Sequence, residues 1–215
     1  MKKTTWLLVA AWLPILFAFK SIENHPISQL PNQSLTLAGS PLNSISPAKK
    51  SKTMFIKKEI IINADIEKCW QLLGEDFAHA DRWASAVSHS EGNGAGFNGA
   101  SCSERSCSTS LGGLKEKLLE FSPEQHLLKY EVAEGMPAMV KNATNDWRLT
   151  SLEKDQTRLT MVAEMQISGL MGTLMKPMMR AKMSKLTGQI AEEFKYFVEN
   201  GAPHPRKVKA MQKKR

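Results

Sequence analysis

The chain has 215 residues, enough for one domain with extensions, and 42% of them are hydrophobic, enough for a proper core. Its formal net charge is +8, and much of that charge lies near the chain ends, which favours contact with anionic membrane surfaces or nonspecific polyanions. The aromatic and basic strand motif of an RNA-binding sheet and the spacing of a helix-turn-helix are both absent, so we expect no specific nucleic-acid partner.

Residues 1–20 carry a targeting pattern. Lys2 and Lys3 precede an apolar run over residues 6–19, which is the order typical of a secretory signal peptide. The run is shorter than the roughly 20 residues of a membrane span, so we favour export over a signal-anchor. Both interpretations predict an exported or membrane-anchored protein outside the cytoplasm, for example in a periplasm. A true start at Met54 is the third interpretation and predicts a cytoplasmic protein.

Two further segments lack the pattern of a folded element. Residues 21–53 are rich in Ser, Pro and Asn, a composition that predicts a disordered linker. Residues 202–215 contain six Lys and Arg side chains and little to bury, which predicts a mobile basic tail that could dock on an acidic partner. The folded domain is therefore expected over residues 54–201.

The domain begins with a strand and two short helices, continues with several strands and ends in a long helix. Alternation predicts strands over residues 55–62, 87–90, 100–109, 114–121, 126–133, 139–152 and 157–167. The short helices are expected from Asp65 and over residues 76–83. The long helix covers residues 170–200, with Pro177 near its first turn. These elements predict an α+β fold in which a curved antiparallel sheet wraps around the C-terminal helix and leaves a cavity between them.

One predicted hairpin brings opposite charges together. Antiparallel partners have position numbers with a constant sum, so a turn near residues 110–111 sets Arg105 across from Glu116. Lys115 and Lys117 occupy the other face of the same strand and supply its solvated side. A buried charge without a partner costs several kcal/mol, so a buried pair has to be satisfied internally. The hairpin alone leaves open whether this pair lies in an apolar pocket or in solvent.

Other chemistry-bearing side chains share the predicted inward faces of the strands. Together with Arg105 and Glu116, the predicted ligand-binding residues are Tyr130, Asn145, Trp147, Met161 and Met165. The aromatic residues and methionines would line an apolar cavity, and the charged pair would orient a polar head group or a carboxylate.

The beginning of the long helix is rich in methionine and in basic residues. Unbranched, polarizable methionine side chains adapt to varied apolar partners, although for any single methionine simple core filling is the preferred interpretation. The interleaved charges are compatible with contact between this part of the helix and an anionic membrane during lipid exchange, but for each charge individually an ordinary solvated face is the preferred interpretation. The residues concerned are Met171, Met175, Met178, Met179 and Met183, and Lys176, Arg180, Lys182 and Lys185.

Cysteine and histidine patterns support neither a disulfide framework nor a metal site. The three cysteines are an odd number, and Cys102 and Cys107 face opposite sides of a regular strand, so we expect free thiols. None of the five histidines pairs at ligand spacing with a cysteine or another histidine. No phosphate-binding glycine loop and no nucleophile elbow is present, so we expect no cofactor.

Several short segments follow one another in a family-like order, although none is diagnostic alone. They are residues 62–70, 81–83, 99–107, Gly113, 116–118, 130–132, 136–137 and Trp147. This order resembles the START-like superfamily and, within it, the SRPBCC group of polyketide cyclase/dehydrase and lipid-transport proteins. The resemblance covers roughly residues 55–201. It implies a helix-grip fold with a hydrophobic ligand cavity, and it places the arginine and the glutamate on central strands.

Besides docking of the basic tail on an acidic partner, two functions of the folded domain are compatible with these features. We favour binding or transport of a small hydrophobic ligand, lipid or polyketide-like, in the cavity between the sheet and the C-terminal helix. The alternative is a cyclase or dehydratase-type enzyme that acts on a hydrophobic substrate in the same cavity, with Glu116, Tyr130 or His126 moving a proton. Pairing with Arg105 would keep Glu116 ionised and make it a poor base, and His126 near a turn is better explained as structural, so we lean away from catalysis.

Overall fold

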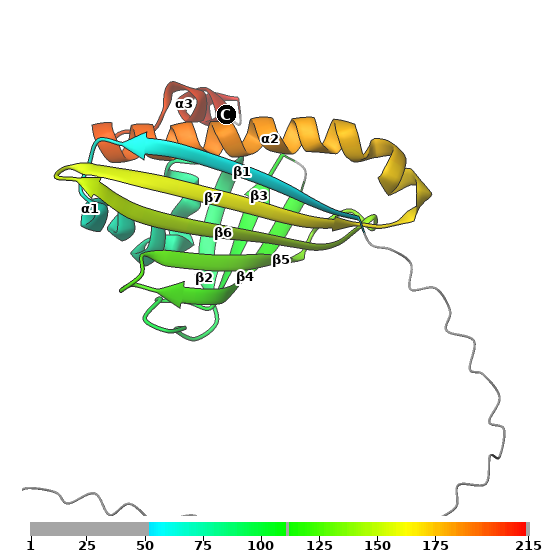
Figure 1. Ribbon diagram of the computed structural model, residues 1–215, viewed down its shortest axis with the longest axis horizontal. Helices are drawn as coiled ribbons and strands as arrows, with labels where there is room; N and C mark the ends of the chain where they lie inside the picture. The colour runs from blue at the N-terminus through cyan, green and yellow to red at the C-terminus, as the bar shows by residue number, and fades with distance from the viewer. Residues whose placement is uncertain (1–51, 111, 214–215) are drawn as a thin grey trace, which may run out of the picture. The chain divides into compact units, whose positions relative to one another are not determined.

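Alternating apolar and polar side chains build seven antiparallel strands in residues 52–110 and 112–213, the part of the chain that the computed structural model describes. The strands form one curved sheet in the order β1-β7-β6-β5-β4-β3-β2 (Figure 1). Their bounds are β1 Lys52–Ile62, β2 Val87–Asn93, β3 Glu104–Thr109, β4 Gly112–Ser122, β5 Leu127–Glu134, β6 Val140–Glu153 and β7 Gln156–Ile167. The predicted curved antiparallel sheet is confirmed.

The connection from β1 to β2 consists of α1 (Ile66–Trp70), the π-helical turn η1 (Gln71–Glu75) and the 3-10 turn η2 (Phe77–Arg82). Asp65 begins α1 because its side chain accepts a hydrogen bond from the Lys68 N–H at 2.8 Å. Gly74 is required where it stands, since a Cβ there would lie 2.6 Å from the Trp70 indole. His79 interrupts η2 with non-helical backbone angles. Two short helical segments after the first strand were predicted, and both are present.

Helix α2 (Gly169–Asn200) lies along the β1 edge of the sheet, as Figure 1 shows. Gly201 ends it in the left-handed conformation with φ 65°, which glycine adopts without steric cost. The start of α2 agrees with the predicted start to within one residue, but the expected position of Pro177 near the first turn is wrong, because Pro177 lies eight residues beyond Gly169, inside the helix. Proline has no N–H for the helical ladder, and the first turns of α2 bend away from the axis of the rest (Figure 1).

Two apolar clusters form the core. The larger cluster joins the short helical turns to the sheet and to the C-terminal half of α2, and it includes Trp70, Phe77, Trp83, Trp147 and Phe194. The smaller cluster lies around β1, β6 and β7 near the beginning of α2, and it includes Met54, Val140, Ala163, Met165 and Ile167. Polar side chains that enter the larger cluster therefore face an apolar interior.

The predicted mobile tail is wrong, because most of it forms helix α3 (Pro205–Gln212). The His204 side chain caps this helix by accepting a hydrogen bond from the Arg206 N–H at 3.0 Å. Arg206 Nε lies 3.3 Å from the carboxylate of Glu193, a fully buried residue of α2. Lys207 is also buried, and its Nζ donates to the Val87 carbonyl at 2.7 Å. The basic residues fold because they satisfy a buried carboxylate and a partly buried carbonyl.

The predicted leader (residues 1–20) lies outside the described residues, and so does the predicted linker (21–53) except for its last two residues, which belong to β1. In residues 52–110 and 112–213, no helix is both long enough and apolar enough to span a membrane.

Removing the charge of Arg206 tests how α3 is held. Arg206→Ala leaves the buried Glu193 carboxylate without its cation, and we expect the free energy of unfolding to fall by about 1 to 3 kcal/mol. Denaturant unfolding measures the loss. Lys209→Ala, at an exposed position of the same helix, is the control and should change stability by less than about 0.5 kcal/mol. Equal losses in the two variants would contradict docking of α3 through Glu193.

Candidate functional site

A buried ion pair on the central strands forms the polar centre of the site. Arg105 on β3 lies directly opposite Glu116 on β4, which confirms the predicted register. Arg105 Nε donates to Glu116 Oε2 at 2.8 Å, and Nη2 donates to the same oxygen. Only 7% of Arg105 and 8% of Glu116 is exposed. The pair therefore lies in the apolar interior, and the solvent-exposed alternative is excluded.

Arg105 also holds the short helical turns against the sheet. Its Nη1 donates to the backbone carbonyl of Phe77 at 2.6 Å. Its guanidinium carbon lies 4.1 Å from the centre of the Phe77 ring and 5.5 Å from the centre of the Tyr130 ring. A cation over an aromatic face is attracted by the ring quadrupole. One side chain thus connects β3, β4, β5 and η2.

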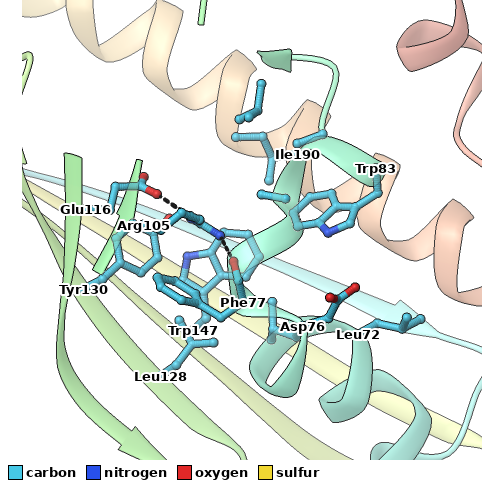
Figure 2. Close-up of a pocket in the computed structure, with 14 residues that line it drawn as sticks. Leu72, Asp76, Phe77, Trp83, Arg105, Glu116, Leu128, Tyr130, Trp147 and Ile190 are labelled. Carbon is cyan, nitrogen blue, oxygen red and sulfur yellow. Dashed lines mark hydrogen bonds and ion pairs between the residues drawn. The ribbon is translucent and has the colours of Figure 1, made fainter. Parts of the chain in front are cut away.

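A cavity of about 80 Å³ lies beside this pair. Half of the residues that line it come from residues 71–84, here called the cover segment, and Figure 2 shows Phe77 of this segment beside Arg105. The predicted location between the sheet and the C-terminal helix needs correction, because Ile190 is the only contribution from α2. The full lining is Leu72, Leu73, Asp76, Phe77, Ala80, Trp83, Ala84, Val87, Arg105, Glu116, Leu128, Tyr130, Trp147 and Ile190.

Four of the seven predicted ligand-binding residues line this cavity: Arg105, Glu116, Tyr130 and Trp147. The other three do not line it. Met161 is buried in the larger core cluster, Met165 belongs to the smaller one, and Asn145 is a half-buried residue opposite Tyr130 in the sheet. Ligand binding by any of the seven stays a prediction.

Sequence reasoning missed the cover segment as a wall of the cavity. Phe77, Ala80 and Trp83 line it from one side. Their spacing of three residues within a predicted short helix was the available signal, since residues three apart share a helix face. The aromatic rings also pack on the core, with the centre of the Trp83 ring 5.2 Å from that of Phe194.

The pair leaves hydrogen-bonding capacity at the cavity. Three N–H groups of Arg105 are engaged by Glu116 and Phe77, and a guanidinium has five. Glu116 uses Oε2 for both bonds from Arg105, and in the described part of the chain Oε1 accepts no hydrogen bond. The cavity wall therefore offers an acceptor and unengaged donors in a mainly apolar setting, in which Asp76, paired with Arg82, is the other charged side chain.

Electrostatics fix the protonation of the groups beside the cavity. Burial disfavours the charged form of Arg105, but the charge and hydrogen bond of Glu116 together with Tyr130 and Cys107 outweigh burial, and the pKa of Arg105 lies above its usual range. Burial and the Glu116 charge raise the pKa of Tyr130 above its usual range, so its phenol stays neutral. Neither Arg105 nor Tyr130 exchanges a proton at neutral pH.

His126 and the three cysteines have reactive side chains, and packing explains their positions. His126 does not line the cavity: it lies 3.1 Å from the Glu67 carboxylate and packs edge-on against Trp70, in agreement with the structural role predicted for it. All three cysteines are free, as predicted, and all three are buried. The Cys107 Sγ lies 3.5 Å from Glu116 Oε2. Among the described residues, no three His, Cys, Asp or Glu side chains come together to hold a metal ion.

Comparison with known proteins identifies relatives of this fold. The family model described as "Polyketide cyclase / dehydrase and lipid transport" matches residues 55–195. A START superfamily protein from Mycobacterium smegmatis is similar with a TM-score of 0.57 and 14% identity, over 69% of this chain and 99% of that one. Norcoclaurine synthase from Thalictrum flavum is similar with a TM-score of 0.58 and 17% identity, over 79% of this chain and 99% of that one. A search of curated proteins gives no match.

Because the ion pair is buried, breaking it should destabilise the fold. Arg105→Leu leaves the Glu116 charge without its partner, and we expect the free energy of unfolding to fall by about 3 to 5 kcal/mol. The control is Lys117→Leu, at an exposed position opposite Glu104 on the same two strands, where we expect a loss below about 1 kcal/mol.

The double variant Arg105→Leu/Glu116→Leu separates the ion pair from packing. With both charges removed, no buried carboxylate is left uncompensated, so the double variant should recover part of the stability that the single variant loses. Equal denaturant midpoints for the wild type and Arg105→Leu would contradict the buried pair.

The buried thiols should make stability depend on alkaline pH. Burial raises the pKa of Cys69 and of Cys107 from 9.0 to about 11. A group whose pKa is raised by folding contributes stability that is complete below its unfolded pKa and is lost as the pH rises through its folded pKa. The free energy of unfolding should therefore fall between about pH 9 and pH 11. Denaturant unfolding should show a smaller fall in Cys107→Ala than in the wild type, and equal falls would contradict the assignment.

Proposed function

The chain belongs to the polyketide cyclase/dehydrase and lipid transport family, and we propose that it binds and carries a small hydrophobic ligand in the cavity beneath the cover segment. The observation that supports the proposal is the unengaged Oε1 of Glu116, which is part of an ion pair beside a cavity with an otherwise mainly apolar and aromatic wall. An apolar cavity with a few convergent polar groups is the usual form of a site for small molecules.

The polar groups at the wall favour a ligand with a hydroxyl group. A hydroxyl donates one hydrogen bond and accepts others, so it can donate to Glu116 Oε1 and accept from an unengaged N–H of Arg105. A ligand carboxylate is disfavoured, since it would lie against the Glu116 carboxylate and like charges repel. The aromatic side chains of the wall, Phe77, Trp83, Tyr130 and Trp147, favour a ring as the apolar part of the ligand. We therefore narrow the lipid or polyketide-like class to hydroxylated ring compounds, of which polyketide-like molecules are one kind.

The size of the cavity adds a requirement for movement. Typical ligand pockets measure about 300 to 1,000 Å³, whereas this cavity measures about 80 Å³. A ring compound enters only if part of the wall moves. The cover segment is the wall best suited to move, because it consists of a π-helical turn and a 3-10 turn that is interrupted at His79.

Carriage is favoured over catalysis because the site lacks a group prepared for proton transfer. The Tyr130 phenol has a raised pKa and is a poor base at neutral pH. Glu116 is held by Arg105, Asp76 at the cavity wall is paired with Arg82, and His126 lies away from the wall. No specific observation in the described residues favours the cyclase or dehydratase alternative.

Three probes of similar size test the proposal: 2-naphthol, 2-methylnaphthalene and naphthalene-2-carboxylate. Each is titrated into the full-length protein by isothermal calorimetry, with quenching of the indole fluorescence of Trp83 and Trp147 as a second readout. We expect 2-naphthol to bind most tightly and the carboxylate least tightly. Undetectable binding of all three, or tightest binding of the carboxylate, would contradict the proposed site.

A variant that fills the cavity should abolish binding of 2-naphthol. Ala80 lines the cavity, and Ala80→Leu adds three carbon atoms there. We expect at least a tenfold loss of affinity, measured by the same titration. Ala133→Leu makes the same change at an exposed position of β5 and should leave the affinity unchanged. Unfolding curves for both variants separate lost binding from lost folding, and retained affinity in a folded Ala80→Leu protein would contradict the location.

A further inference from the structure

The beginning of α2 exposes large apolar side chains on one face. Leu170 is 89% exposed, Leu174 is 75% exposed and Met178 is 44% exposed. These three residues, here called the α2 stripe, follow one another at intervals of four. Residues four apart are neighbours on the surface of a helix, so the stripe is continuous.

The opposite face of the same turns packs on the domain, which fixes the direction of the stripe. Gly172 is buried so closely that a Cβ there would lie 2.5 Å from the Ile167 side chain. Met179 and Met183 pack against the smaller core cluster. Lys176 is also held to the domain, since its Nζ donates to the Thr53 carbonyl at 3.2 Å. The stripe is therefore the outward face of a docked helix.

The charges around the stripe are all positive. Arg180, Lys182 and Lys185 are exposed on the turns that continue from it. No Asp or Glu occurs in residues 165–191. An apolar face bordered by basic residues is the pattern of helices that lie in the interface of an anionic membrane.

We propose that the α2 stripe binds the surface of an anionic lipid bilayer. Leu170, Leu174 and Met178 enter the boundary between head groups and acyl chains, and the three cations contact lipid phosphates. The positive charge beside the stripe favours a membrane over a second copy of the chain. Two copies would bring two positively charged faces together, whereas an anionic surface attracts the cations.

This proposal rests on observations separate from those for the ligand. The α2 stripe and the cavity share no residue, and Ile190, where α2 reaches the cavity, lies twelve residues beyond Met178. At 1.5 Å per helical residue that separation is about 18 Å. Failure of membrane binding and failure of ligand binding are therefore measured independently.

The test places an environment-sensitive fluorophore in the stripe. The full-length variant Leu174→Cys is labelled with a nitrobenzoxadiazole maleimide, and the three native thiols are buried and protected. Vesicles of phosphatidylcholine with 30% phosphatidylglycerol are then added. We expect a blue-shifted and brighter emission at position 174, and little change with vesicles of phosphatidylcholine alone. The same label at Leu119→Cys, on an exposed position of β4, should not respond.

A matched pair of charge variants measures the electrostatic part. In the labelled Leu174→Cys protein, Arg180→Gln/Lys182→Gln/Lys185→Gln should weaken vesicle affinity by about fivefold for each cation, or about 100-fold in all. Lys68→Gln/Lys117→Gln/Lys154→Gln removes three exposed cations from α1, β4 and the β6–β7 turn and should change the affinity by less than about fivefold.

Three outcomes would overturn the proposal. The first is an unchanged emission at position 174 in the presence of the anionic vesicles. The second is a blue shift without vesicles that grows with protein concentration, which would assign the stripe to a second copy of the chain. The third is a blue shift without vesicles at every concentration, which would assign it to residues 1–51 of the same chain.

Discussion

The buried charge of Arg105 is the constraint on which the site depends. A guanidinium in an apolar core requires a counter-charge and acceptors for its N–H groups. Glu116 supplies the charge and fixes the register of β3 and β4, and the Phe77 carbonyl supplies an acceptor and fixes the cover segment. Because one residue sets the strand register and the position of the cover segment, the polar centre and the wall of the cavity form together.

Local geometry explains which parts of the site could be predicted. The pairing of Arg105 with Glu116 follows from the arithmetic of a tight hairpin, and alternation gives the inward faces of Tyr130 and Trp147. Alternation predicts which face of the sheet a side chain occupies, but it does not predict where along a curved strand the cavity lies. Met165 is on the predicted face, but it belongs to the smaller core cluster and does not line the cavity. The cover segment was missed because tertiary packing against Arg105 shapes its irregular turns.

The C-terminal end shows the limit of composition as a guide. Short basic segments are usually solvated, and this one folds as α3 because Glu193 on α2 is fully buried. Its carboxylate accepts bonds from the Ser85 N–H and hydroxyl at 2.8 and 2.6 Å and is neutralised by Arg206. The buried carboxylate of Glu193 requires a cation, but Glu193 lies thirteen residues before Arg206. The composition of residues 202–215 therefore does not reveal this requirement. Pro177 is the converse case, in which packing of α2 on the sheet overrides a strong local preference.

These contacts divide the cover segment into a fixed end and a releasable middle. Ser85 and Val87, just beyond its C-terminal end, are bound by Glu193 and Lys207. Its middle is held to the sheet by Arg105 at the Phe77 carbonyl and by Ser90 at the Ala78 carbonyl. A buried donor that loses its partner costs about 1 to 3 kcal/mol. A hydroxyl oxygen has two lone pairs. Under the proposed function, the ligand hydroxyl would accept the Arg105 N–H that Phe77 releases as well as an unengaged one, so the ligand itself would offset the cost of opening.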